Sequence, residues 1–160
     1  MTSSVGNVYE KCIAMSKADS IFDAVWENTF GLRITLEWDI ALAFIERIGE
    51  YNDFDSKKVL QALQYIDEII PRMKYGDGNP NNGLRDFKIS VGREYSPVIY
   101  IERFELYRSD FPKNPLTGEM VKRICGIMTD VALADESDCE IIDNQDLGMG
   151  KSFEFRFWWD

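Results

Sequence analysis

Seven carboxylates, with no lysine or arginine among them, lie between residues 130 and 146 and are the residues best placed to do chemistry in this chain. We call them the acidic run: Asp130, Asp135, Glu136, Asp138, Glu140, Asp143 and Asp146. Like charges packed this densely repel one another, and a bound cationic partner would relieve that repulsion. Carboxylates hold a metal for hydrolysis only where several converge on one point, and among those on predicted strands Glu102 and Glu105 are three apart, which puts them on opposite faces. The sequence therefore predicts that the acidic run binds a partner, with no catalytic residues and no metal ligands.

Other catalytic chemistry is restricted by the residue types that the chain lacks. It contains no histidine, which excludes Ser-His-Asp and Cys-His mechanisms and every histidine-ligated metal site. It also lacks a Walker A motif and a complete dinucleotide-binding glycine motif. Carboxylate-only chemistry remains as an alternative, in which Asp and Glu side chains hold a metal for hydrolysis. We expect no cofactor and no enzymatic activity.

The overall charge points to the kind of partner. The chain has 160 residues and a net charge of −10, and 45% of its residues are hydrophobic, which is typical of one packed domain spanning residues 1–160. An acidic surface repels nucleic acid, because lysine and arginine drive phosphate binding. A basic protein, or a protein that normally binds nucleic acid, is the favoured partner. The alternative is that the charge serves only solubility.

Cysteine usage and hydropathy bear on the compartment. Cys12, Cys125 and Cys139 are few and unevenly spaced, which suits a reducing environment better than a disulfide framework. No apolar stretch approaches the roughly 20 residues of a membrane helix, and the first residues do not resemble a secretory signal. We expect a cytoplasmic protein that does not bind membranes.

The elements that would position these residues fall into two parts, a helical one over about 1–75 and a sheet-containing one over about 84–160. Apolar residues recur at helical spacing over 21–30, then from a cap at Thr35 to Ile48, and then from Asp55 to Ile70. After the breaker at 76–83 the period becomes two, which predicts strands over 87–91, 98–107, 139–143 and 152–159, with a helix capped by Thr117 between them. Segregated helices and strands indicate an α+β fold: N-terminal helices followed by β-β-α-β-β, with the helices on one face of an antiparallel sheet.

One residue outside the acidic run is a candidate for the same surface. In the last predicted strand Phe153, Phe155, Phe157 and Trp159 share the core side, which puts Trp158 on the opposite side. If that side is uncovered, Trp158 is an exposed aromatic of the kind enriched in interface anchors. If a second layer of helices covers it, Trp158 belongs to an ordinary core.

Together these observations favour a non-enzymatic acidic protein that binds and blocks a macromolecular partner. An immunity protein that neutralises a nuclease toxin and a phage-borne inhibitor of a nucleic-acid-guided defence complex both fit this description. Two alternatives remain: a small metal-dependent enzyme with Asp and Glu ligands, and a homo-oligomeric assembly module that self-associates through the face of Trp158.

Overall fold

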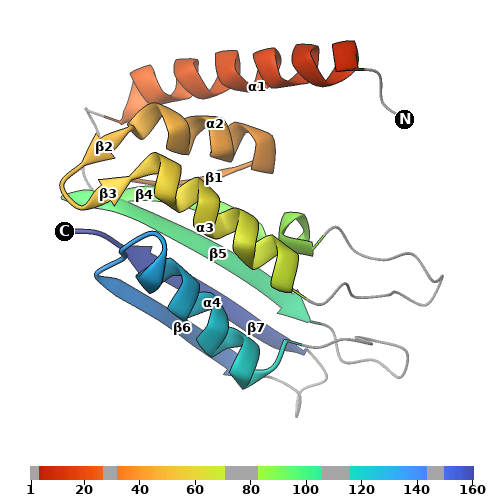
Figure 1. The fold of residues 1–160 in the computed structure, drawn as a ribbon, viewed down its shortest axis with the longest axis vertical. Helices are drawn as coiled ribbons and strands as arrows, with labels where there is room; N and C mark the ends of the chain where they lie inside the picture. The colour runs from red at the N-terminus through yellow and green to blue at the C-terminus, as the bar shows by residue number, and fades with distance from the viewer. Residues whose placement is uncertain (1–3, 27–31, 71–82, 106–115, 144–149) are drawn as a thin grey trace.

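The chain forms an α+β structure in the computed structural model, which describes residues 4–26, 32–70, 83–105, 116–143 and 150–160 (Figure 1). The acidic-run residue Asp146 and the ends of two predicted elements, at Phe30 and Tyr107, lie outside these ranges. The elements in chain order are α1 (Ser4–Val25), β1 (Leu32–Leu36), α2 (Trp38–Ile48), β2 (Glu50–Tyr51), β3 (Phe54–Asp55), α3 (Ser56–Ile69), the 3-10 turn η1 (Gly83–Asp86), β4 (Lys88–Glu94), β5 (Ser96–Glu105), α4 (Gly118–Asp130), β6 (Glu136–Asp143) and β7 (Lys151–Trp158).

Five of the strands form one antiparallel sheet in the order β1-β4-β5-β7-β6. β2 and β3 form a separate two-stranded hairpin. The predicted α+β class is confirmed, and the described elements of the C-terminal part follow one another as β4, β5, α4, β6 and β7. Because β7 lies between β5 and β6, the edges of the large sheet, as far as its strands are described, are β1 and β6.

One expectation for the N-terminal part is wrong. Thr35 was expected to cap a helix, but it lies in β1, where its hydroxyl is 2.9 Å from that of Ser90 on β4. The helix begins later, after Glu37. The segment from Leu32 to Leu36 alternates apolar and polar residues over only five positions, which is too short to outweigh the helical pattern that follows it.

The other helix boundaries follow local chemistry that the sequence carries. Asp55 caps α3, because its carboxylate Oδ1 accepts a hydrogen bond from the backbone N–H of Lys57 at 2.9 Å. α3 ends at Ile69, and Ile70 is extended before Pro71. Thr117 caps α4 as predicted, by accepting a hydrogen bond from the N–H of Met120 at 3.2 Å.

The hydrophobic core lies between the sheet and the helices that pack on one of its sides (Figure 1). The three phenylalanines of β7 are at most 1% exposed, and Trp159 is fully buried, which confirms the predicted core side of this strand. The indole N–H of Trp159 donates to the backbone oxygen of Ala132 at 2.8 Å. The buried ring therefore keeps a hydrogen-bond partner.

Helix α1 is an outer layer that packs on α2 (Figure 1). Its C-terminal part is held by the aromatic rings of Phe22 and Trp26, whose centroids lie 5.3 and 5.8 Å from that of Phe44. Its N-terminal part leaves Val8 and Tyr9 exposed, at 62% and 69%. Among the described helices, none combines the length and the apolar character needed to cross a membrane.

Candidate partner-binding surface

The side of the sheet opposite the core, which we call the open face, carries polar side chains from each of the five strands. The register places side chains in rows across the sheet, since directly paired residues point to the same side. One row runs Thr35, Ser90, Tyr100, Arg156, Asp138, and the next runs Lys88, Glu102, Glu154, Glu140. Trp158 lies on this face between Val98 and Glu136.

Three members of the acidic run come together on the open face. Glu136, Asp138 and Glu140 alternate along β6, so all three project to the same side, and all three are exposed. β6 has only one neighbouring strand among the described residues, which is β7. These three carboxylates therefore line one margin of the open face.

The other described members of the acidic run lie elsewhere. Asp130 is the last residue of α4, and Asp143 ends β6 opposite Lys151. Asp135 precedes β6, and its carboxylate accepts a hydrogen bond from the backbone N–H of Asp160 at 2.8 Å. The structure thus brings three of the seven together and spreads another three over the helix end and the strand ends.

Two arginines bind carboxylates in the middle of the open face. Arg156 on β7 donates to Glu136 at 3.0 Å and to Glu94 at 2.8 Å. The Tyr100 hydroxyl also donates to Glu94 at 2.8 Å. The hydrogen bonds from Arg156 and Tyr100 hold the pKa of Glu94 below its ordinary value.

Arg33 of β1 is the second arginine of this face. Its guanidinium bridges Glu102 and Glu154, 3.1 Å from the latter, and lies over the ring of Tyr100 at 3.8 Å from its centroid. Burial raises the pKa of Glu154, but the hydrogen bonds from Arg33 and with Glu102 outweigh it, so this pKa lies below its ordinary value. Because Arg33 lies on a strand that the sequence pattern failed to reveal, its role could not be predicted.

The balance of charge across the open face remains negative. Six carboxylates project from its described strands against three cations, which are Arg33, Lys88 and Arg156. Among the described residues, Asp138 and Glu140 form no ion pair. The uncompensated acids of this face therefore gather on its edge strand.

Trp158 is half-buried on the open face, an outcome between the two alternatives that the sequence left open. Its neighbour Val98 is fully buried, although no described helix covers this side of the sheet. The strand pairing places Trp158 directly beside both Val98 and Glu136. An aromatic surface thus adjoins the acidic margin.

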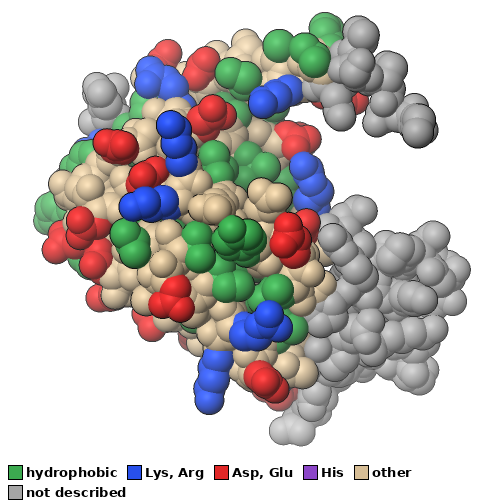
Figure 2. Space-filling view, in the orientation of Figure 1, with side chains coloured by type: hydrophobic (Ala, Val, Ile, Leu, Met, Phe, Trp, Pro, Cys, Tyr) green, Lys and Arg blue, Asp and Glu red, His purple; other side chains and the backbone are tan. Residues whose placement is uncertain are grey.

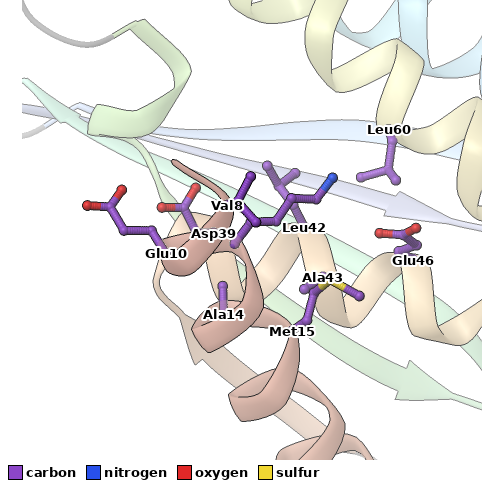
Figure 3. A pocket seen from close by; sticks show the side chains of 10 residues that line it. Val8, Glu10, Ala14, Met15, Asp39, Leu42, Ala43, Glu46 and Leu60 are labelled. Carbon is purple, nitrogen blue, oxygen red and sulfur yellow. The ribbon is translucent and has the colours of Figure 1, made fainter. Parts of the chain in front are cut away.

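The helix-covered side has a different character. Figure 2 shows its Asp and Glu side chains interspersed with Lys and Arg, and hydrophobic side chains gathered on α1 and between the helices below it. A groove of about 490 Å³ lies between α1 and α2 (Figure 3). It is lined by Val8, Glu10, Lys11, Ala14, Met15, Asp39, Leu42, Ala43, Glu46 and Leu60.

The described residues offer little that resembles an active centre. No three of their Cys, Asp and Glu side chains are arranged to hold a metal ion. Glu102, Glu154 and Glu140 share a row, but Arg33 bridges the first two. Burial raises the pKa of Cys139 to about 12 and also raises that of Cys125, which disfavours the nucleophilic thiolate.

Comparisons with models of known protein families, with curated proteins and with solved structures found no match for this chain. The function is therefore argued from the open face itself.

Proposed function

We propose that this protein is a non-enzymatic inhibitor that binds a basic or nucleic-acid-binding protein partner through the acidic margin of its open face. The observation that carries the proposal is that Asp138 and Glu140 are exposed on one side of an edge strand and form no ion pair within the described structure. The other carboxylates of this face are held by arginines. A cationic group of a partner could bind Asp138 and Glu140 at the margin in the way that the arginines bind the other carboxylates.

Electrostatics gives this surface a defined role. Two opposite charges 4 Å apart attract by about 1 kcal/mol in water and by about 4 kcal/mol at a partly dehydrated surface. Exposed charges mainly raise the association rate and fix the orientation of a complex. Trp158 beside Glu136 supplies aromatic area that the same contact can bury. A basic groove that normally holds nucleic acid fits such a surface, and blocking it would inhibit the partner.

Two biological forms of this inhibitor remain open. In one, the protein is an immunity protein that neutralises a nuclease toxin. In the other, it is a phage-borne protein that blocks a nucleic-acid-guided defence complex. Both act in the cytoplasm on a partner whose natural ligand is polyanionic.

Capture of the partner at two salt concentrations tests the proposal. The chain is immobilised and incubated with host lysate at about 0.01 M and about 0.15 M ionic strength, between which the screening length falls from about 30 Å to about 8 Å. We expect a basic partner that is retained more strongly at low salt and loses nucleic-acid binding when the chain is added. Capture indifferent to salt, or a partner that still binds nucleic acid in the complex, would contradict the proposal.

A matched pair of variants separates a local surface from overall charge. Asp138→Lys with Glu140→Lys, and Glu10→Lys with Glu46→Lys, each change the net charge from −10 to −6, since every reversal adds two charges. Only the first pair alters the open face, because Glu10 and Glu46 line the groove of Figure 3. We expect the first pair to abolish capture and the second to leave it intact. Equal losses would refute a role for the acidic margin.

Self-association is a second candidate function, and the exposure of α1 favours it. Val8 and Tyr9 are 62% and 69% exposed, and Met15 is 43% exposed beside the groove. Exposed apolar surface of this kind marks interaction sites. Light scattering tests this candidate: a dimer that dissociates on Val8→Ser with Tyr9→Ser supports it, and a monomer at all concentrations rules it out.

A further inference from the structure

β6 is an edge strand, and this matters because its backbone can recruit another strand. Its pairing with β7 runs without interruption from Glu136 opposite Trp158 to Asp143 opposite Lys151. That pairing uses one side of its backbone, and the other side faces no strand among the described residues. An edge of this kind presents backbone N–H and C=O groups that template pairing with a further strand.

Apart from its charged side chains, β6 lacks the common devices that block such pairing. Proteins also protect an edge with proline, a bulge or a very short strand, and lysine is the charged residue used most often. β6 contains neither proline nor lysine, is eight residues long and pairs with β7 in a one-to-one register. It also exposes Ile141 and Ile142, at 43% and 48%. The opposite edge, β1, has only five residues.

The charges on β6 decide which strand could be added. An added strand would place alternate side chains directly beside Glu136, Asp138 and Glu140. If β6 paired antiparallel with a second copy of itself about Cys139, Asp138 would face Glu140, and like charges opposite each other are destabilising. If it paired with β1 of a second copy, the cation offered would be Arg33, which already holds Glu102 and Glu154. The occupant is therefore a different chain with cations at alternate positions.

We propose that β6 binds an extended segment of its partner, with lysine or arginine at every second position, as a sixth strand of the sheet. This inference rests on the proposed function and adds to it the mode of docking and the chemistry of the partner's segment. Backbone hydrogen bonds along β6 would hold the segment, and its alternate cations would lie over the carboxylates of the open face. The partner's remaining surface would then lie against the half-buried Trp158 and the rest of the open face.

The test uses the full chain and a peptide probe. The probe is an acetylated and amidated peptide of the length of β6 in which lysine and valine alternate. Its control is the same peptide with N-methyl groups on every second residue, which keeps the charge but removes the backbone donors that face β6. Binding is measured by calorimetry at about 0.01 M ionic strength, where attraction between exposed charges is little screened. Hydrogen exchange then locates the protected amides.

We expect the alternating peptide to bind, to protect amides of β6 and not of β1, and to bind at least about tenfold more tightly than its N-methylated control. The pair Asp138→Lys with Glu140→Lys should weaken binding about tenfold or more, while Glu10→Lys with Glu46→Lys should leave it unchanged. Because the peptide comparison uses the unmodified chain, a folding defect cannot produce it.

Each contrary result has a defined meaning. Equal binding of both peptides would overturn strand addition, and salt-sensitive capture could still support the proposed function. Absence of binding by the alternating peptide, or protection of β1 in place of β6, would also overturn it. A dimer of the chain alone that protects β6 would identify a second copy as the occupant and refute the proposal. Failure of the unmodified chain to capture any basic partner from the lysate, by contrast, would refute the proposed function itself.

Discussion

The buried ion pair of Arg103 and Glu105 on β5 allows a double-mutant prediction whose size follows from the structure. Both side chains point to the core side of the sheet, and they are 2% and 0% exposed. Arg103 Nε lies 3.2 Å from Glu105 Oε1, and the same oxygen accepts a hydrogen bond from the backbone N–H of Leu116 at 2.7 Å. The guanidinium also lies 5.2 Å from the centroid of the Phe87 ring. The pair thus joins the end of β5 to the segment that precedes α4.

Removing both partners should cost less than the two single removals added together. Glu105→Gln keeps an acceptor for Leu116 but leaves the charge of Arg103 buried, and Arg103→Met leaves the charge of Glu105 buried. Breaking a buried pair in this way costs about 3–5 kcal/mol, a large part of a total stability of about 5–15 kcal/mol. For a chain of this size that corresponds to a fall of about 6–20 °C in Tm. The double variant removes both charges of this pair, so we expect its loss to be smaller than the sum of the two single losses.

Urea unfolding of the four proteins, followed by circular dichroism, measures the coupling. We expect a coupling free energy of about 2 kcal/mol or more between the two positions. The parent chain is the reference, and equal dependence of stability on urea concentration in all four proteins shows that the same transition is compared. If the two single losses simply add in the double variant, the ion pair contributes no interaction energy and the reasoning is refuted.

Three other predictions concern the open face, the thiols and the sheet. The pKa of Glu94 in the folded protein lies below 4.5 because of its hydrogen bond from Arg156. The ionised carboxylate therefore stabilises the folded protein above about pH 4.5, and this stabilisation is lost as the pH falls further. In Glu94→Gln, the urea midpoint of unfolding should fall less steeply as the pH is lowered. A thiol reagent at about pH 8 should label the exposed Cys12 before Cys139, whose pKa is about 12, and equal rates by mass spectrometry would show that Cys139 is not shielded. A Cβ at Gly92 would lie 2.5 Å from a backbone oxygen of β1, so Gly92→Ala should destabilise the chain by about 1–3 kcal/mol in thermal melts, and an unchanged Tm would contradict this packing.

Much of the fold could be predicted because its signals are local. Asp55 and Thr117 mark the starts of α3 and α4 through their capping side chains, and Pro71 marks the end of α3. The period of two in β7 identified its core side and placed Trp158 on the other side. These features depend on residues a few positions apart, which a single sequence displays directly.

The rest depends on contacts between distant segments. β1 is stabilised by pairing with β4, which lies more than fifty residues later in the chain. Its own five residues are too few for a strand to be predicted from their alternation. Glu105 forms an ion pair with Arg103, which lies two positions away on the same strand and not on a neighbouring one. Glu154 is held by Arg33, whereas Arg156 holds Glu94 and Glu136. Sequence spacing predicts the side of the strand on which a charged side chain lies, but it does not predict which residue of a neighbouring strand pairs with it.

The acids of β6 admit two physical explanations, and they make different predictions. Charges on an edge strand can serve only to prevent pairing between copies, and for that purpose lysine serves as well as aspartate or glutamate. Recognition of a cationic segment requires the negative sign. Replacing Asp138 and Glu140 by lysine keeps the edge charged and reverses its sign. If the variant stays monomeric and still captures its partner, the acids only protect the edge. If it stays monomeric and no longer captures the partner, the negative charge of these residues is needed for binding.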